Sequence, residues 1–497
     1  MTAARRLRVL IVDLNNFALY PSIAIGYLTA VLRQGGFETE LLAPLARGIT
    51  GVAREPRPPW WGVWDKTFRW RTGVTRSRLI RAVRARYTAY SASKLARARH
   101  ELVAELERRL DDGFDAVLVS TYLMYRPHCV EIGKVCERRG VPMILGGPYF
   151  AARDVAREWI DLPGLSALVG GEVEPHLCEI VRAAVAREPM AHIPGVWQTQ
   201  AGFTLDAPPL TNLDALPFAD YSLAPWDKYP RPMVPMITGR GCGWGVCTFC
   251  SDVASTVGRT FRSRSPDNVL AELEHQHARH DARLFVFTDL KLNSNVDLWR
   301  SLGREVQRAV PEARWIGAVH VGTRGDNGLS AEELRAARAA GMVRITTGVE
   351  SGSQRLLDLM AKGTDLDRTS AFLADAHAAG ISVRTTMFTG YPGEQAEDLD
   401  RTTRFLEQHE RYLERVPMYR FAIMTGTVFE QQLQRRPSHF PSLADLEPNH
   451  RLALVGYRYE QTERPDYRRA VVRLFRVVHR INRRPLRPAA RDFEGVM

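Results

Sequence analysis

Short apolar runs alternate with stretches of helical periodicity along the first 190 residues. Residues 8–13 (RVLIVD) have the length of a buried strand, and residues 22–34 repeat apolar positions at helical spacing after Pro21. Further strand-length runs follow at 38–43, 116–121, 142–147 and 167–171, and further helices are expected at about 127–139, 150–159 and 173–187. Short strands that alternate with helices predict an α/β fold with a doubly wound parallel sheet.

Ligands of such sheets bind beyond the carboxyl ends of the strands. In this chain those ends fall at 13–20, 120–125, 146–149 and 170–174. Two of them carry glycine pairs, Gly146-Gly147 and Gly170-Gly171, which either allow close backbone approach to a ligand or form tight turns.

Residues 46–112 interrupt the alternation and are interpreted as an insertion in a domain that spans residues 1–190. Their second half, from about Arg76 to Leu110, has helical periodicity and is strongly basic, and their first half is crowded with aromatic side chains. These are Trp60, Trp61, Trp64, Phe68 and Trp70. The segment is compatible with a substrate lid, a membrane-surface helix or a nucleic-acid surface. The favoured interpretation is that the tryptophans pack the insertion onto its host domain.

The rest of the chain divides into three parts. Residues 191–232 are proline-rich and are expected to form an ordered linker. Strand-length runs separated by helices resume over 233–426, at 234–239, 284–289, 314–321, 344–350, 381–390 and 417–425. Six units rather than eight predict a partial (β/α)6 barrel with its site at the carboxyl ends of the strands. Residues 427–497 are expected to be helical and basic.

Composition and charge narrow the class of protein. A chain of 497 residues exceeds one ordinary core, and 45% hydrophobic with 25% charged residues is typical of a soluble globular protein. No run approaches the ~18–20 apolar residues of a transmembrane segment, and no signal-peptide core opens the chain, so a cytoplasmic protein is expected. The net charge of +12 is concentrated in residues 54–100, with 13 Lys/Arg against 2 Asp/Glu, and in residues 464–491, with 10 Arg against one Asp. Such segments either meet anionic ligands or are solvated helix faces.

Three cysteines lie within nine residues just after the first barrel strand, in the sequence GCGWGVCTFC. Cys242, Cys247 and Cys250 make up half of the cysteines of the chain, and the other three are scattered without a disulfide-like pattern. Three closely spaced thiolates suit an iron–sulfur cluster or a zinc site. With three protein ligands one metal is left open to bind a second molecule, which indicates chemistry more than structure.

This loop resembles the cluster loop of the radical S-adenosylmethionine (AdoMet) enzymes. Residues 348–352 (GVESG), with the segment up to Lys362-Gly363, and residues 388–394 (FTGYPGE) are similar to later motifs of that family. The N-terminal domain, with Tyr20-Pro21-Ser22 and residues 145–148 (LGGP), is similar to the cobalamin-binding domain of the family's cobalamin-dependent branch. The resemblance covers roughly residues 7–45 and 113–426.

Two features depart from the commoner family patterns. Four residues, rather than three, separate Cys242 from Cys247, as in the tryptophan-containing loops of this branch. The Asp-x-His-x-x-Gly motif of many cobalamin proteins is absent, since the first histidine is His100. The resemblance therefore implies cobalamin without a histidine on cobalt, its lower face meeting Asn15, Asn16 or Tyr122, or only solvent.

The resemblance implies three cofactors: a [4Fe–4S] cluster on the three cysteines, AdoMet on its open iron, and cobalamin. An electron from an external flavodoxin- or ferredoxin-like donor then cleaves AdoMet to a 5′-deoxyadenosyl radical, and methylcobalamin methylates the substrate radical, giving a C-methylation. Cobalamin binding is implied for Asn15, Asn16, Tyr20, Ser120, Thr121, Tyr122, Gly146, Gly147, Gly171 and Glu172. AdoMet binding is implied for Phe249, Asp289, Glu350, Ser351, Arg384 and Gly390. His320, Tyr391 and Tyr419 are the candidates for facing the barrel lumen and the substrate, or else they are packed core residues.

Several alternatives stay open at this stage. A small-molecule or peptide precursor of a natural product is the expected substrate of the methyl transfer. The same cofactors also serve cyclases and ring-rearranging relatives that transfer no methyl group. A cobalamin-binding sensor with a structural zinc site would need a fourth ligand near the loop, and the closest histidines are His275, His277 and His280. Nucleic-acid modification is suggested only by the basic segments, with no recognisable nucleic-acid module, and is not expected.

Overall fold

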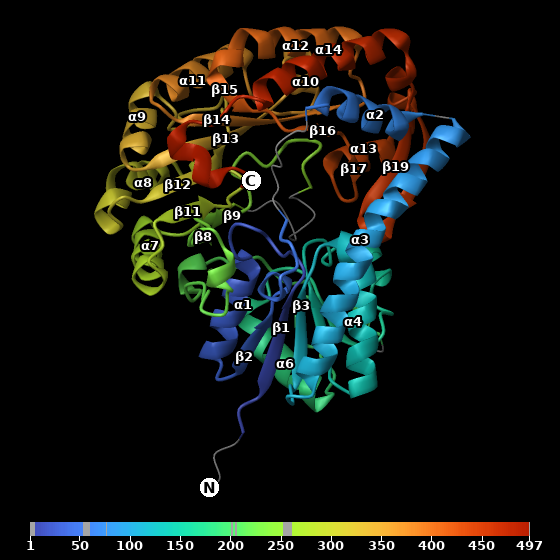
Figure 1. Cartoon of the computed structure of the whole chain (residues 1–497), viewed down its shortest axis with the longest axis vertical. Helices are drawn as coiled ribbons and strands as arrows, with labels where there is room; N and C mark the ends of the chain where they lie inside the picture. Colours follow the sequence, from blue (N-terminus) through green and yellow to red (C-terminus); the bar gives the residue numbers. More distant parts are fainter. Residues whose placement is uncertain are drawn as a thin grey trace.

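The computed structural model describes residues 5–52, 60–75, 77–199, 202–203, 206–251 and 261–496. It has an N-terminal α/β domain and a larger α/β domain, and the N-terminal domain is the lower one in Figure 1. The chain begins in the lower domain, and its C-terminal end lies between the two.

The N-terminal domain is a sheet with the strand order β2-β1-β3-β4-β5-β6-β7. Its first five strands are parallel, and the last two join the edge in antiparallel fashion. The strands are β1 (Arg8–Asp13), β2 (Glu38–Leu42), β3 (Ala116–Ser120), β4 (Met143–Gly146), β5 (Leu165–Val169), β6 (Val196–Gln198) and β7 (Gly202–Phe203). The helices are α1 (Ile23–Gln34), α4 (Arg126–Arg139), α5 (Arg153–Arg157) and α6 (Leu177–Ala186). The five expected strands are present, while β6 and β7 extend the sheet from within the expected linker.

The order of the strands reverses between β1 and β3, which is where sheets of this kind bind ligands. The inner strands β1, β3 and β4 are short and mostly apolar because helices cover both of their faces, whereas the edge strand β2 (ETELL) is partly exposed. β1, for example, buries every residue from Val9 to Asp13.

The insertion forms two helices, α2 (Gly62–Val74) and α3 (Arg78–Leu110). α3 runs beside α4 along the N-terminal domain and extends up toward α2, which lies against the upper domain (Figure 1). Trp70 is buried and stacks on Tyr467 of that domain with ring centroids 5.9 Å apart, whereas Trp60 and Trp64 are 89% and 79% exposed. The prediction that the tryptophans pack the insertion onto its host domain is therefore wrong. Of the four tryptophans only Trp70 is buried, and it packs against the other domain.

The larger domain is built on a curved parallel sheet with the order β15-β14-β13-β12-β11-β8. Its strands are β8 (Met233–Met236), β11 (Leu284–Phe287), β12 (Arg314–Val319), β13 (Met342–Glu350), β14 (Ser382–Thr389), β15 (Leu413–Arg415) and β16 (Met418–Arg420). β15 and β16 both pair with β14, so the sixth strand position is occupied by two short pieces. The helices are α7 (Pro266–His280), α8 (Val296–Ala309), α9 (Ala331–Ala339), α10 (Gln354–Leu359), α11 (Leu366–Ala378) and α12 (Ala396–His409).

The C-terminal region closes this domain. It contains α13 (Val428–Arg435) and α14 (Pro465–Asn482), as expected, and also a small antiparallel sheet that was not anticipated. That sheet joins β17 (Ile423–Met424), β19 (Leu454–Tyr459) and β18 (Leu443–Asn449). Phe493 and Val496 are fully buried in one apolar cluster with Met233 and Ile316 of the barrel strands and Tyr20 of the N-terminal domain. The C-terminal end thus fills the interface between the domains.

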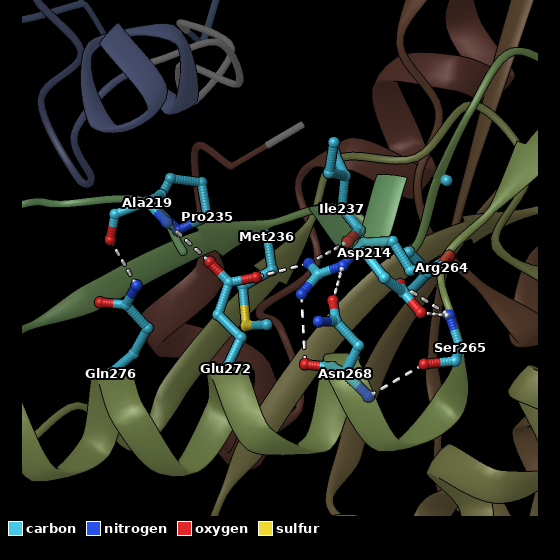
Figure 2. A network of polar contacts seen from close by, with 12 residues as sticks. Asp214, Ala219, Pro235, Met236, Ile237, Arg264, Ser265, Asn268, Glu272 and Gln276 are labelled. Carbon is cyan, nitrogen blue, oxygen red and sulfur yellow. Dashed lines mark hydrogen bonds and ion pairs between the residues drawn. The ribbon is translucent and has the colours of Figure 1, made fainter. Parts of the chain in front are cut away.

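A buried polar network fixes the chain just before the cysteine loop (Figure 2). Arg264 donates from Nη1 to the carbonyl oxygen of Ile237 at 3.0 Å and forms an ion pair with Glu272, and both side chains are at most 4% exposed. The other carboxylate oxygen of Glu272 accepts the backbone N–H of Ala219 at 3.0 Å. One ion pair therefore ties α7, the linker and β8 together.

Replacing Arg264 by methionine is expected to destabilise the protein by about 3–5 kcal/mol, because it leaves the Glu272 carboxylate buried without its partner. The exposed pair of Arg283 with Glu312 provides the control, since Arg283→Met is expected to cost about 1 kcal/mol or less. Urea denaturation of both variants measures the difference. Equal losses of stability would show that the buried network is not what holds this region.

Candidate functional site

The base of the cysteine loop is pinned by a two-stranded ribbon, β9 (Gly239–Arg240) and β10 (Arg262–Ser263). Asp289, just beyond β11, accepts the backbone N–H groups of Thr238 and Gly239 at 3.0 Å and the Thr238 hydroxyl at 2.8 Å. Burial raises the pKa of Asp289 to about 6, against these hydrogen bonds, which lower it. In this structure Asp289 thus braces the approach to the loop.

Glu172 clamps that ribbon to the N-terminal domain. Its two carboxylate oxygens accept from Arg262 at 2.6 and 2.9 Å, and Arg240 lies 3.6 Å away. Burial alone would raise the pKa of Glu172, but the hydrogen bond from Arg262 and the charge of Arg240 outweigh it and lower that pKa. Glu174 forms a further ion pair with Arg240. The structure therefore uses Glu172, which the sequence assigned to a cofactor, in a contact between the domains.

The three cysteines of the loop carry thiol groups of intermediate burial, close enough that the charges of Cys242 and Cys250 act on Cys247. Burial raises the pKa of Cys247 to about 11, opposed by the nearby Lys362 ammonium. Among the described residues, no three His, Cys, Asp or Glu side chains converge as ligands of a single metal ion. Residues 252–260, which follow the loop, lie outside the described part of the chain.

A buried cation faces the thiols. The Nζ atom of Lys362 lies 3.1 Å from Oε1 of Glu350 and 5.6 Å from the centre of the Phe249 ring. Burial lowers the pKa of Lys362, but the charges of Glu350 and Cys247 outweigh it, so the pKa is raised and the ammonium persists. The motif that ends in Lys362-Gly363 did not indicate a role for this lysine.

A bulge in β13 aims Glu350 at this lysine. Glu350 has a φ of +62°, where the register of β13 against β14 shifts. A Cβ on Gly348 would lie 2.1 Å from Oε1 of Glu350 and 2.9 Å from Nζ of Lys362, so a larger residue here would have to displace this ion pair. The GVE sequence thus has a geometric reason at this site.

Trp244 closes the other side of the loop. Its Nε1 donates to the carbonyl oxygen of Ala361 at 3.0 Å, and its ring lies 5.7 Å from that of His320. Burial and the charges of Lys362 and Lys291 lower the pKa of His320 to about 3, so its ring is neutral near pH 7. Its Nε2 has no hydrogen-bond partner within the described residues. His320 therefore fits a neutral side chain whose Nε2 forms a hydrogen bond with a ligand.

The other expected AdoMet and substrate residues fall into different settings. Phe249 packs at 5.1 Å on Phe388, and Ser351 is fully buried, its hydroxyl 3.2 Å from that of Thr402. Arg384 is buried within β14. Tyr391 is buried under the loop, its hydroxyl 2.9 Å from that of Thr248, whereas Tyr419 of β16 is 53% exposed.

The turn after β14 is held from below by a buried carboxylate. The backbone N–H of Gly390 donates to Oε2 of Glu394 at 2.6 Å, and the Tyr467 hydroxyl of α14 donates to the same oxygen. Gly390 has a φ of +84° and nothing within 4 Å of where a Cβ would stand, so its outer face is open to a ligand. Burial raises the pKa of Glu394 to about 7.

Glu394 is expected to make stability depend on pH. Because its folded pKa of about 7 lies above the ordinary 4.5, the folded chain keeps a proton that the unfolded chain releases between these values. Stability therefore falls as pH rises through this window, by up to about 1.4 kcal/mol per unit. Glu394→Gln cannot lose this proton. The difference in thermal midpoint, variant minus wild type, is therefore expected to increase as the pH is raised from about 5 to 8. Exposed Glu397→Gln is the control, and parallel pH profiles of Glu394→Gln and wild type would contradict the assignment.

The N-terminal domain holds a cavity of about 420 Å³ at the carboxyl ends of its strands. Ser120, Gly146, Gly147 and Gly171 line it together with apolar residues of α1 and α6, and Ile237 and Arg240 reach it from the larger domain. A Cβ on Gly146 would meet only a carbonyl oxygen at 3.9 Å, so this glycine leaves room in the cavity.

The remaining residues expected at cobalamin do not line this cavity. Asn15 and Asn16 follow β1, are 4% and 8% exposed, and each has a side-chain oxygen without a hydrogen-bond partner among the described residues. Thr121 is buried and donates to the carbonyl oxygen of Tyr122, which is 38% exposed. Tyr20 packs in the apolar cluster between the domains.

Comparison with known proteins identifies the larger domain. Residues 236–406 match the Radical SAM superfamily. This segment is a radical SAM domain. The match begins at the last residue of β8 and includes the cysteine loop, the Glu350 bulge and the Gly390 turn.

Relatives extend the similarity beyond the radical SAM domain. An uncharacterized methyltransferase of Pyrococcus horikoshii is 25% identical over 316 residues, covering 62% of this chain and 66% of the relative. An anaerobic magnesium-protoporphyrin IX monomethyl ester cyclase of Rubrivivax gelatinosus is 26% identical over 277 residues, covering 52% and 47%. The chain thus spans about half to two thirds of the length of these curated relatives.

A solved structure matches almost the whole chain. The radical S-adenosylmethionine methyltransferase TsrM from Kitasatospora setae, solved with tryptophan substrate and the AdoMet analogue aza-SAM, superposes with a TM-score of 0.66 at 17% identity. The match covers 98% of this chain and 90% of TsrM. The expected fold class, a doubly wound N-terminal domain followed by a partial radical SAM barrel, is confirmed.

Proposed function

We propose that this chain is a cobalamin-dependent radical AdoMet enzyme that transfers a methyl group to a carbon atom of a small molecule or peptide. The observation that carries the proposal is the position of Arg240. It lines the glycine-rich cavity of the N-terminal domain and lies two residues before Cys242. The cavity and the cysteine loop therefore meet at one place in the molecule.

The side chains at the loop fit a [4Fe–4S] cluster and AdoMet. The charges of Cys242 and Cys250 act on Cys247, and the Lys362 ammonium offsets the negative charge of bound thiolates. The open face of Gly390 leaves room beside the loop. Binding of iron requires deprotonation of Cys247, whose pKa is raised to about 11 without metal. Cys242, Cys247 and Cys250 would hold the cluster, with Phe249, Glu350 and Gly390 beside AdoMet.

The N-terminal cavity is lined mostly by apolar residues, and cobalamin is the ligand proposed for it. Gly146 leaves room in the cavity, and the unpartnered oxygens of Asn15 and Asn16, just beyond β1, can accept hydrogen bonds from amide groups. When bound, the cluster with AdoMet supplies radical chemistry and cobalamin supplies a methyl group. The chain itself orients the groups, excludes water and, through neutral His320, is suited to hydrogen-bond a ligand.

The relatives support methyl transfer and also name its competitor. TsrM and the Pyrococcus horikoshii relative are methyltransferases by name, and the Rubrivivax gelatinosus relative is a cyclase. A cyclase reaction without methyl transfer is accordingly the second candidate. The electron donor proposed for either reaction is an external flavodoxin- or ferredoxin-like protein.

Anaerobic purification with cobalamin, metal and sulfide analysis, and incubation with reductant and AdoMet test the proposal. We expect about four irons and one cobalt per chain, together with 5′-deoxyadenosine. A methyltransferase also forms S-adenosylhomocysteine and moves a labelled methyl group from AdoMet to cobalamin. Formation of 5′-deoxyadenosine without S-adenosylhomocysteine would favour the cyclase, and zinc in place of iron would exclude both.

A further inference from the structure

An apolar surface of the insertion is left uncovered by the residues that the structure describes. Four of its side chains come from α2 and the turn before it, and three come from the start of α3. They are Trp60 (89% exposed), Trp61 (40%), Trp64 (79%), Phe68 (48%), Leu79 (76%), Ile80 (40%) and Val83 (48%). Together we call them the insertion patch. Clusters of exposed apolar side chains on this scale mark sites of interaction rather than ordinary surface.

The patch is an outward face, not an unfinished core. α2 buries its opposite face, where Trp70 and Val74 pack into the apolar core that includes α14. Trp64 and Phe68 are four residues apart, so they project from the same, outward side of the helix. The helix is therefore already anchored, and its aromatic side is available to a partner.

The patch is embedded in positive charge. Residues 60–86 contain eight Lys or Arg residues against one acidic residue, Asp65. Arg69 already pairs with Asp65 at 2.9 Å, while Arg78, Arg81 and Arg86 are exposed on the first turns of α3. This positive charge favours an anionic partner.

We propose that the insertion patch docks the enzyme onto the surface of an anionic lipid bilayer. Tryptophans beside basic residues are the composition that settles at the headgroup level of membranes. The exposure of the side chains favours a bilayer over a peptide, because a side chain that keeps 79–89% of its surface accessible protrudes and does not line a groove. No described helix is long and apolar enough to cross a membrane, so the contact is with one face of the bilayer.

Docking in this way would place one edge of the barrel beside the lipid. Arg420 of β16 donates to the carbonyl oxygen of Gly73, in the last turn of α2, at 2.7 Å. The neighbouring Tyr419 is half exposed on the same strand. The barrel edge formed by β16 is thus fixed to the docking helix.

Sedimentation of the full chain with lipid vesicles tests the proposal. The wild type is expected to sediment with vesicles of equimolar phosphatidylcholine and phosphatidylglycerol but not with phosphatidylcholine alone, and less so as salt is raised. The double variant Trp60→Ser/Trp64→Ser and the double variant Arg78→Glu/Arg81→Glu are each expected to lower the partition coefficient roughly tenfold or more. All four side chains are exposed, so these variants are expected to keep the wild-type circular dichroism spectrum.

Matched controls change similar side chains outside the patch. Met124→Ser removes a 69% exposed apolar side chain, and Arg308→Glu reverses an 83% exposed charge on α8. Both are expected to bind vesicles like wild type. Absence of wild-type binding to the anionic vesicles, or equal loss in the controls, would overturn the proposal. So would binding of single-stranded RNA in place of vesicles, or a Trp60- and Trp64-dependent dimer that does not bind lipid.

Discussion

Replacing Cys247 by alanine is expected to remove most of the bound iron and to bring AdoMet cleavage below detection. Cys247 lies between the other two cysteines in the chain, and both of their charges as well as that of Lys362 act on it. Without this thiol two ligands remain, which is too few to hold a four-iron cluster. Iron and sulfide analysis, together with assay of 5′-deoxyadenosine, measures the loss.

The scattered cysteines offer a matched control. Cys178 of α6 is also a free thiol of intermediate burial, so Cys178→Ala is expected to keep wild-type iron and activity. Cys247→Ala should still bind cobalamin, because the cavity of the N-terminal domain does not involve the thiol. If Cys247→Ala kept its iron, the loop would not be the cluster site.

A phenylalanine in place of Gly146 is expected to weaken cobalamin binding while leaving the iron content unchanged. Gly146 ends β4 and lines the cavity, and its Cβ position is free of clashes, so a large side chain there projects into the space proposed for the ligand. Crowding of this kind costs on the order of 1–3 kcal/mol, which corresponds to a tenfold to hundredfold loss of affinity. Cobalt analysis and the visible absorption of the purified protein report the binding.

Gly146→Ala is the control for this site. A single methyl group there meets only the carbonyl oxygen of Val169, at 3.9 Å, and is expected to be tolerated. Wild-type cobalt in Gly146→Phe would mean that cobalamin binds elsewhere. Simultaneous loss of iron and cobalt would instead indicate that the variant is misfolded.

The regular core of the fold could be predicted because its signals are local. Residues 9–12 and 284–287 are unbroken apolar runs, and a strand covered on both faces needs such a run. The β18–β19 hairpin gave no such signal. β18 reads LADLEPN, with exposed residues and a proline, and becomes a strand only by pairing with β19.

The candidate site was predictable as a loop but not as a set of contacts. The spacing of the cysteines is visible in the sequence, whereas the meeting of Lys362 with Glu350 depends on a bulge in β13. Glu172 was expected at a cofactor, but its partner Arg262 is 90 residues away in the chain. The exposure of Trp60 could not be predicted from the sequence either, because aromatic composition does not show which side chains pack against other residues.

The contacts of the linker limit where domains can be exchanged between such enzymes. The backbone N–H of Leu210 donates to Glu172 at 2.7 Å while its carbonyl oxygen accepts from Arg262 at 2.9 Å. Ten residues later the backbone N–H of Asp220 donates to the carbonyl oxygen of Gly26 at 3.0 Å, and its side chain pairs with Arg33 of α1. The linker thus contacts both domains. A chimera joined anywhere within it loses native contacts on both sides of the junction. A hybrid should therefore also take the contact residues in both domains, such as Glu172 and Arg262, from the parent that supplies residues 206–232.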